Sequence, residues 1–213
     1  MFCTDDETDF GGTAELMVHE LRHRFANELA STLATLHMVK ARGPDDALIA
    51  TAIQRVEAQA RILRFMCEPL PAKTRVAEML GKLCHLIIRS RPDGERVVAR
   101  IIASDVMLDH KRARQLKTIV FELLTNACKH MDRGTIRIFV QVRDDRLRVT
   151  ISNPVGRSSA QPGSGTGLDT VRALIAQVNG HFQVAHGPRS FRCMIGIPVK
   201  TGSGVPCGND GAQ

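Results

Sequence analysis

A short stretch of the chain, FELLTNACKH at residues 121–130, carries an acid, an amide and an ammonium group at helical spacing. Glu122, Asn126 and Lys129 stand at positions i, i+4 and i+7, so a helix places them on one face. The other side of this helix is apolar and is predicted to pack on a sheet. Mg²⁺ prefers hard oxygen ligands and keeps waters, which a carboxylate can orient. The stretch therefore predicts a metal–phosphate site, and the alternative is a solvated helix face.

A second candidate site is a glycine-rich stretch before an apolar-periodic helix, formed by Gly163, Ser164, Gly165, Thr166, Gly167 and Leu168. Glycines let backbone N–H groups approach phosphate oxygens, and a helix start adds positive partial charge. The alternative is a flexible loop. The GxGxG spacing differs from the Rossmann GxGxxG pattern, and the chain contains no GxxxxGK[ST] P-loop.

A candidate nucleophile lies near the N-terminus, in HELRHRFANEL. His19, His23 and Asn27 follow each other at intervals of four residues and share one stripe of a helix. Phe25 lies about 200° around the helix from His23, so His23 points away from the apolar side. An exposed imidazole with a near-neutral pKa suits a phosphorylated nucleophile. The alternative is a pair of surface histidines on an arginine-rich face.

The composition is that of an ordinary soluble globular protein: 213 residues, 43% of them hydrophobic and 24% charged. A net charge of +7 suits an acidic partner such as a nucleotide, and the absence of Trp and Tyr argues against aromatic stacking on nucleic acid. The six cysteines form no CxxC pair, which predicts reduced thiols and a cytoplasmic location. The sequence contains no apolar run of about 18 residues, so no membrane-spanning helix is predicted.

The N-terminal region is predicted to be a helical hairpin. Apolar residues recur at spacings of three and four from 13 to 42, and ARGPDD at 41–46 separates this helix from a second one that ends near residue 67. One hairpin cannot bury its apolar stripe alone, whereas two hairpins across a two-fold axis form a four-helix bundle. Residues 13–70 therefore predict a homodimer, preceded by a disordered arm at 1–12.

Residues 74–200 are predicted to form an α+β domain with helices on one face of a mixed sheet. The expected helices cover 76–89, 111–129 and 168–178. The expected strands cover 96–102, 106–108, 135–143, 146–152, 181–185 and 191–198. Asp144 and Asp145 are expected to form a hairpin turn. The glycine-rich tail at 201–213 is predicted to be disordered.

The two phosphate-site motifs together resemble those of the GHKL, or Bergerat-type, ATP-binding domain shared by histidine kinases, gyrase, Hsp90 and MutL. ELLTNACKH is similar to the N-box, and GSGTGL is similar to the second glycine box. The resemblance covers about residues 74–198 and implies an α/β sandwich with ATP and Mg²⁺ as ligands. It implies that Asn126 holds Mg²⁺, that Glu122 orients water or acts as a base, and that Lys129 and His130 contact phosphate or the domain interior.

The first glycine box departs from the family pattern. The family expects Asp-x-Gly-x-Gly, in which the Asp reads the adenine amino group, but this chain has Asn153, Pro154, Val155 and Gly156. An asparagine carbonyl can still accept a hydrogen bond from an amino group, although it carries no charge. The lid at 157–162 is short. Weak or absent nucleotide binding is therefore an open alternative.

With this domain downstream, the N-terminal helix resembles that of two-component histidine kinases. HRFANEL, at 23–29, is similar to the HRxxNxL phosphoacceptor box of the HWE-related kinases, with Ala26 in place of the usual Lys. HELR at 19–22 is a competing match to the HELRTPL box, but the TPL is absent. We predict His23 as the phosphoacceptor, with His19 as the alternative.

The resemblance implies a histidine kinase that autophosphorylates His23 from ATP and passes the phosphoryl group to an Asp of a response-regulator receiver domain. Because no sensor domain fits in residues 1–12, a separate sensor protein is a further expected partner. One alternative is a histidine phosphotransferase with a degenerate ATP site. Another is a serine kinase or anti-sigma-like regulator, a group that lacks the helical hairpin. Nucleic-acid binding is disfavoured because no helix-turn-helix pattern occurs.

Overall fold

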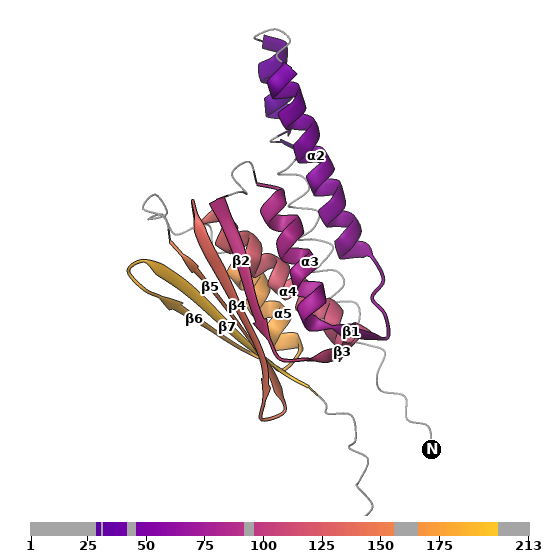
Figure 1. Cartoon of the computed structure of the whole chain (residues 1–213), viewed down its shortest axis with the longest axis vertical. Helices are drawn as coiled ribbons and strands as arrows, with labels where there is room; N and C mark the ends of the chain where they lie inside the picture. The colour runs from indigo at the N-terminus through magenta and orange to yellow at the C-terminus, as the bar shows by residue number, and fades with distance from the viewer. Residues whose placement is uncertain (1–28, 31, 42–45, 92–95, 156–165, 200–213) are drawn as a thin grey trace, which may run out of the picture.

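The structure is a computed structural model, and it describes residues 29–30, 32–41, 46–91, 96–155 and 166–199. A helical hairpin stands beside an α+β domain (Figure 1). The predicted arm at 1–12 and the predicted tail at 201–213 lie outside the described residues. None of the helices in the described ranges is long and apolar enough to cross a membrane.

The region predicted to be a helical hairpin is helical where the chain is described. Residues 29–30 and 32–41 are helical, and α2 spans Asp46–Cys67. The C-terminal part of α2 joins the core of the α+β domain through Ile62, Phe65 and Met66. Toward the far end of the hairpin, large apolar side chains remain exposed: Leu29, Leu33, Leu36, Met38, Ile53 and Val56.

The sheet of the α+β domain has five strands in the order β2-β4-β5-β7-β6. The strands are β2 (Val97–Ala103), β4 (Gly134–Arg143), β5 (Arg146–Pro154), β6 (His181–His186) and β7 (Ser190–Pro198). β2 runs parallel to β4 and the other neighbours are antiparallel, so the predicted mixed sheet is confirmed. The β4–β5 turn has positive φ at Asp144 and Asp145, 53° and 55°, as a tight two-residue hairpin turn requires.

Three helices cover one face of this sheet: α3 (Val76–Arg89), α4 (His110–Lys129) and α5 (Thr166–Gln177) (Figure 1). Most strand residues that face them are apolar, as in the buried Ile136, Ile138 and Val140 that alternate along β4. α4 begins one residue earlier than predicted because the Asp109 carboxylate accepts a hydrogen bond from the Arg112 N–H at 2.9 Å.

A second, two-stranded sheet was not predicted in full. β1 (Lys73–Arg75) pairs antiparallel with β3 (Met107–Asp109), the strand that was expected at 106–108. A three-residue strand is too short to show an alternating pattern, so β1 left no signal in the sequence. The pairing ties the segment after α2 to the start of α4.

A buried lysine joins the hairpin to the α+β domain. Lys117 of α4 is 1% exposed, and its Nζ donates hydrogen bonds to the carbonyl oxygens of Phe65 at 3.0 Å and Glu68 at 3.4 Å. These carbonyls lie at the C-terminal end of α2, where a cation is favoured by the helix dipole. The ammonium also lies 5.1 Å from the centroid of the Phe65 ring. Burial lowers the pKa of Lys117, and the nearby Arg114 lowers it further.

We expect Lys117→Ala to lower the free energy of unfolding by about 2–4 kcal/mol, because it leaves two carbonyls unpaired and opens a cavity. Chemical denaturation of the two proteins would measure the difference. Lys82→Ala, at an exposed position of α3, is the matched control and should change stability by less than about 0.5 kcal/mol. Equal effects of the two substitutions would show that Lys117 does not hold the two parts together.

Candidate nucleotide-binding site

The ends of four elements meet at one edge of the five-stranded sheet. β5 runs toward this edge and ends at Pro154, and antiparallel β4 begins there at Gly134. The C-terminal end of α4 precedes β4 by a few residues and so lies at the same edge. α5 leads into β6 at the opposite edge, where His181 pairs with Gly196, so its N-terminal end points back to the first edge.

Gly134 allows α4 and β5 to end close together. Its φ is +124°, and a Cβ at this position would lie 2.8 Å from Cγ of Pro154. Both the backbone conformation and the contact therefore require glycine. The close approach keeps the chain that leaves α4 against the end of β5, next to Asn153.

Asn153 lies on the helix-facing side of β5 and is 3% exposed. Its Nδ2 donates to the carbonyl oxygen of Pro154 at 2.9 Å. Its Oδ1 is buried and has no hydrogen-bond partner among the described residues. An unpaired buried acceptor costs about 1–3 kcal/mol, so this oxygen is suited to a donor from a ligand. This is the residue that the sequence places at the adenine-reading position.

The three polar residues of the N-box stretch differ in exposure along α4. Glu122 is 1% exposed, Asn126 is half-buried and Lys129 is exposed. The alternative of a solvated helix face is therefore wrong for Glu122. The accessible part of the stretch is the last turn of α4, which is the part that reaches the edge of the sheet.

Arg91 holds this last turn in place. Its guanidinium donates to the carbonyl oxygen of Cys128 and, at 3.1 Å, to the carbonyl oxygen of Met131. A cation at the C-terminal end of α4 also complements the helix dipole. No role for Arg91 was predicted from the sequence. Its partners are backbone carbonyls, and Met131 lies 40 residues further along the chain.

His130 is the C-cap residue of α4, and its N–H donates to the Asn126 carbonyl at 3.1 Å. Burial lowers the pKa of its imidazole, and the neighbouring Lys129 lowers it further. Both effects favour the neutral ring, so Lys129 supplies the positive charge at this end of the helix. An ammonium group at the rim of the site can attract a phosphate group.

The structure thus brings Asn126, Lys129, His130 and Asn153 to one edge of the sheet. From the second glycine box, Thr166, Gly167 and Leu168 belong to the first turn of α5, and the Leu168 side chain packs against the core. The remaining predicted site residues lie outside the described residues: Gly163, Gly165, His19 and His23. Their positions relative to this edge stay predictions.

The residues at this edge fit a nucleotide and a divalent cation. The unpaired Oδ1 of Asn153 can accept from an amino group, and the start of α5 offers backbone N–H groups and positive partial charge to phosphate. The side-chain amide oxygen of Asn126 is a hard ligand of the kind that Mg²⁺ accepts.

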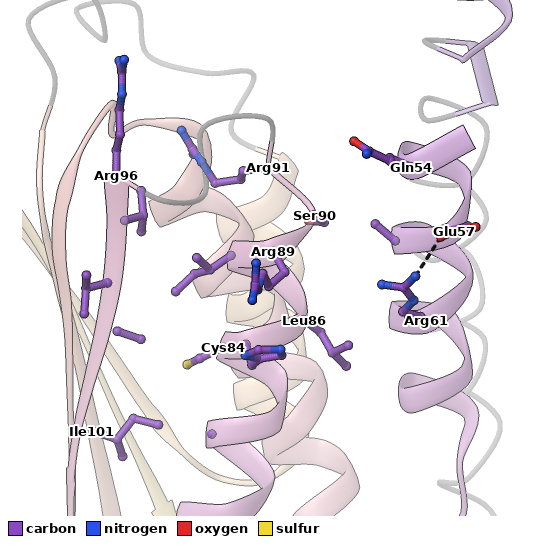
Figure 2. Close-up of a pocket in the computed structure, with 17 residues that line it drawn as sticks. Gln54, Glu57, Arg61, Cys84, Leu86, Arg89, Ser90, Arg91, Arg96 and Ile101 are labelled. Atoms are coloured by element: carbon purple, nitrogen blue, oxygen red, sulfur yellow. Dashed lines mark hydrogen bonds and ion pairs between the residues drawn. The ribbon is translucent and has the colours of Figure 1, made fainter. Parts of the chain in front are cut away.

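A separate cavity of about 1490 Å³ lies between α2, α3 and β2 (Figure 2). Gln54 and Arg61 reach into it from α2, and Arg89 borders it from α3. Arg61 forms an ion pair with Glu57 on its own helix at 2.8 Å. Because none of the predicted nucleotide-site residues lines this cavity, it is distinct from the nucleotide site.

Residues 111–201 match the family described as histidine kinase-, DNA gyrase B-, and HSP90-like ATPase. This part of the chain, from α4 to β7, is therefore similar to a histidine kinase-like ATPase domain. A comparison with curated protein sequences found no match.

Solved structures of histidine kinases share the fold. The Acinetobacter baumannii histidine kinase AdeS superposes with a TM-score of 0.53 at 18% identity, covering 84% of this chain and 98% of that one. The blue-light activated histidine kinase EL346 of Erythrobacter litoralis superposes with a TM-score of 0.51 at 23% identity, covering 86% of this chain and 62% of that one. A structure described as a bacterial phosphotransferase superposes with a TM-score of 0.55 at 13% identity, covering 90% of this chain and 98% of that one.

We expect Gly134→Ala to lower the free energy of unfolding by about 1–3 kcal/mol, because the alanine Cβ meets Pro154 and the backbone has positive φ. Thermal unfolding would measure the change. Gly81→Ala in α3 is the matched control: a Cβ there meets nothing within 4 Å, so the helix should gain about 0.5–1 kcal/mol. A neutral Gly134→Ala would contradict the proposed close approach.

Proposed function

We propose that this chain is an ATP-dependent histidine kinase of a two-component phosphorelay. It autophosphorylates His23 and passes the phosphoryl group to an Asp of a response-regulator receiver domain. The observation that carries the proposal is the buried, unpaired Oδ1 of Asn153 at the adenine-reading position of a histidine kinase-like ATPase domain. An acceptor of this kind is expected in a protein that binds a ligand with an amino group at this point.

Each site residue has a distinct role in the proposed reaction. Asn153 accepts a hydrogen bond from the adenine amino group, and the backbone at the start of α5, with Gly163 and Gly165 before it, contacts the phosphates. Lys129 attracts the phosphates electrostatically. Asn126 would hold Mg²⁺, which neutralises charge on the phosphoryl group when bound.

Glu122 has a different role because it is buried one turn before Asn126. A carboxylate at this depth is held by its surroundings and can orient a water molecule or accept a proton near the cation. Phosphoryl transfer depends mostly on positioning and charge stabilisation, so fixed groups along one helix suit it.

The choice of His23 as phosphoacceptor is supported by the similarity of HRFANEL to the HRxxNxL box. His19 remains the alternative. AdeS and EL346, which share the fold, are both described as histidine kinases.

A histidine phosphotransferase is the second candidate function. Asn153 replaces the acidic residue that the ATP-binding family expects, which removes a charge from the base-reading position. A structure described as a bacterial phosphotransferase shares the fold. In this alternative His23 exchanges its phosphoryl group with receiver domains and ATP is not used.

The hairpin supports a homodimer in either case. Its exposed leucines and other large apolar side chains form a surface that two copies could bury as a four-helix bundle. A second hairpin is the occupant that the helical spacing of these residues favours.

Incubation of the purified protein with γ-labelled ATP and Mg²⁺ tests the proposed kinase. We expect acid-labile, alkali-stable label in the wild type, and its loss to background in His23→Ala and Asn126→Ala. Asn153→Leu should also lose label, since it removes the acceptor for adenine. His110→Ala, an exposed histidine at the start of α4, is the matched control and should label normally.

The outcomes separate the candidates. Loss of label in His19→Ala instead of His23→Ala would move the phosphoacceptor by one turn. An unlabelled wild type that accepts phosphate from a phosphorylated receiver domain would be a phosphotransferase. Absence of label from both sources would exclude phosphorylation of a histidine.

The dimer gives a separate prediction. Leu33→Glu places a charge in the exposed apolar surface of the hairpin, so we expect a protein that is dimeric at micromolar concentration to become monomeric. Light scattering after gel filtration would measure the mass. Lys40→Glu, at an exposed polar position of the same helix, should leave the dimer intact. A monomeric wild type would rule out the four-helix bundle.

A further inference from the structure

The face of the five-stranded sheet opposite the helices carries an unusual set of charges. None of its five strands contains an aspartate, a glutamate or a lysine, but they contain six arginines. Register and alternation place all six on the same face: Arg100, Arg137, Arg143, Arg146, Arg148 and Arg192. In the described part of the chain, no helix covers this face (Figure 1).

Three of these arginines form a row across the sheet. Arg100 of β2 pairs directly with Arg137 of β4, and Arg137 is separated from Arg192 of β7 by Ser152 of β5. Neighbouring strands lie about 4.8 Å apart, so the Cα atoms of the three arginines lie within about 15 Å of one another. Like charges directly opposite each other destabilise a sheet.

The charges in this row have no compensation within the described residues. Arg100, Arg137 and Arg192 are exposed, and no carboxylate there forms an ion pair with them. Asp144 in the β4–β5 turn contacts Arg143 at 3.8 Å and Arg148 at 3.4 Å, at the far end of the face. Because the positive charges of these three arginines repel one another and have no counter-charge nearby, the row is suited to an anionic ligand.

An apolar row runs beside the arginine row. Ile102 of β2 pairs with Phe139 of β4, and the row continues through Thr150 of β5 to Met194 of β7. Ile102 is 61% exposed and Phe139 is 39% exposed. Arg148 lies on the other side of this row, so arginines border an apolar strip on both sides.

An apolar centre with an arginine-containing rim is the usual arrangement of a protein–protein interface. A nucleic acid presents phosphates and would leave the exposed Ile102 and Phe139 without a partner. Arginine pairs in a bidentate manner with carboxylates and with phosphates alike, so the exposed apolar side chains are what distinguishes a protein partner from a nucleic acid. The combination favours carboxylates around an apolar surface over phosphates alone.

The size of the face fits a transient complex. Across the strands, the five-stranded sheet is about 19 Å wide, and along the strands β4 and β5 are about 30 Å long. The area of the face is therefore about 600 Å². Counted on both partners, this is about 1,200 Å², at the lower end of specific interfaces.

We propose that the open face of the sheet is a docking surface for an acidic protein partner. Carboxylates of the partner pair with Arg100, Arg137 and Arg192, and its apolar side chains cover Ile102 and Phe139. The surface lies on the opposite side of the sheet from Asn153, so a partner can dock while the nucleotide site is free. This inference does not depend on the proposed kinase activity.

Binding of defined probes to the full chain tests the proposal. A random copolymer of glutamate and tyrosine serves as the acidic, apolar probe, with polyglutamate, a short DNA duplex and phosphatidylserine vesicles for comparison. We expect the copolymer to bind most tightly, and the triple variant R100Q/R137Q/R192Q to lose about tenfold in affinity. Phe139→Ser should weaken binding of the copolymer but leave binding of the DNA duplex unchanged.

The control variant K73Q/K82Q/R64Q removes three positive charges at exposed positions of β1, α3 and α2, away from this face. It should keep the affinity of the wild type. An equal loss in the control would show that net charge alone attracts the probe. Tighter binding of DNA or vesicles with the same dependence on the three arginines, or no binding of any probe, would overturn the proposal.

Stability of the free protein provides a second measurement. If Arg100 and Arg137 repel each other, Arg137→Gln should raise the midpoint of thermal unfolding in the absence of any partner. Lys73→Gln should leave it unchanged. A lowered midpoint in Arg137→Gln would show that the row contributes to the fold and is not kept for binding.

Discussion

The contact between Lys117 and the C-terminal end of α2 is the polar constraint that fixes α2 against the α+β domain, together with the packing of Ile62, Phe65 and Met66. It places a buried ammonium group from the central helix of the α+β domain against backbone carbonyls at the C-terminal end of α2. α4 also carries the predicted N-box residues, so one helix contacts α2 through Lys117 and reaches the candidate nucleotide site through Asn126. The separation between hairpin and site is therefore set by the rise of a single helix, about 1.5 Å per residue.

The candidate nucleotide site is assembled by the order and direction of the strands more than by contacts between side chains. The C-terminal end of α4, the end of β5 and the start of α5 reach one edge of the sheet because of strand order. The contact between Gly134 and Pro154 then sets how closely they approach. Asn153 is buried at this point with one oxygen unpaired, so an acceptor is present at the position that departs from the family pattern.

Sequence patterns predicted most helices and strands to within a few residues, because apolar periodicity reports burial directly. α3 at Val76–Arg89 matched its predicted range, and the β4–β5 hairpin matched closely. β1 and the role of Arg91 were not predictable, since a three-residue strand has no period and a cation–carbonyl contact depends on tertiary structure. Lys117 could have been noticed: it falls on the stripe of Val120 and Leu124, where a lysine needs a buried partner. The roles of His19 and His23 rest on sequence similarity.

The distribution of arginines in the sheet also bears on how the strands find their partners. Side chains alternate along a strand, so a shift of one residue would exchange its two faces. In β4 and β5 such a shift would turn Arg137 or Arg148 into the apolar core and expose the isoleucines and valines that now fill it. The penalty for burying an unpaired guanidinium group is large enough to exclude that pairing. The arginines thus disfavour every strand register that is shifted by an odd number of residues, whether or not a partner is bound.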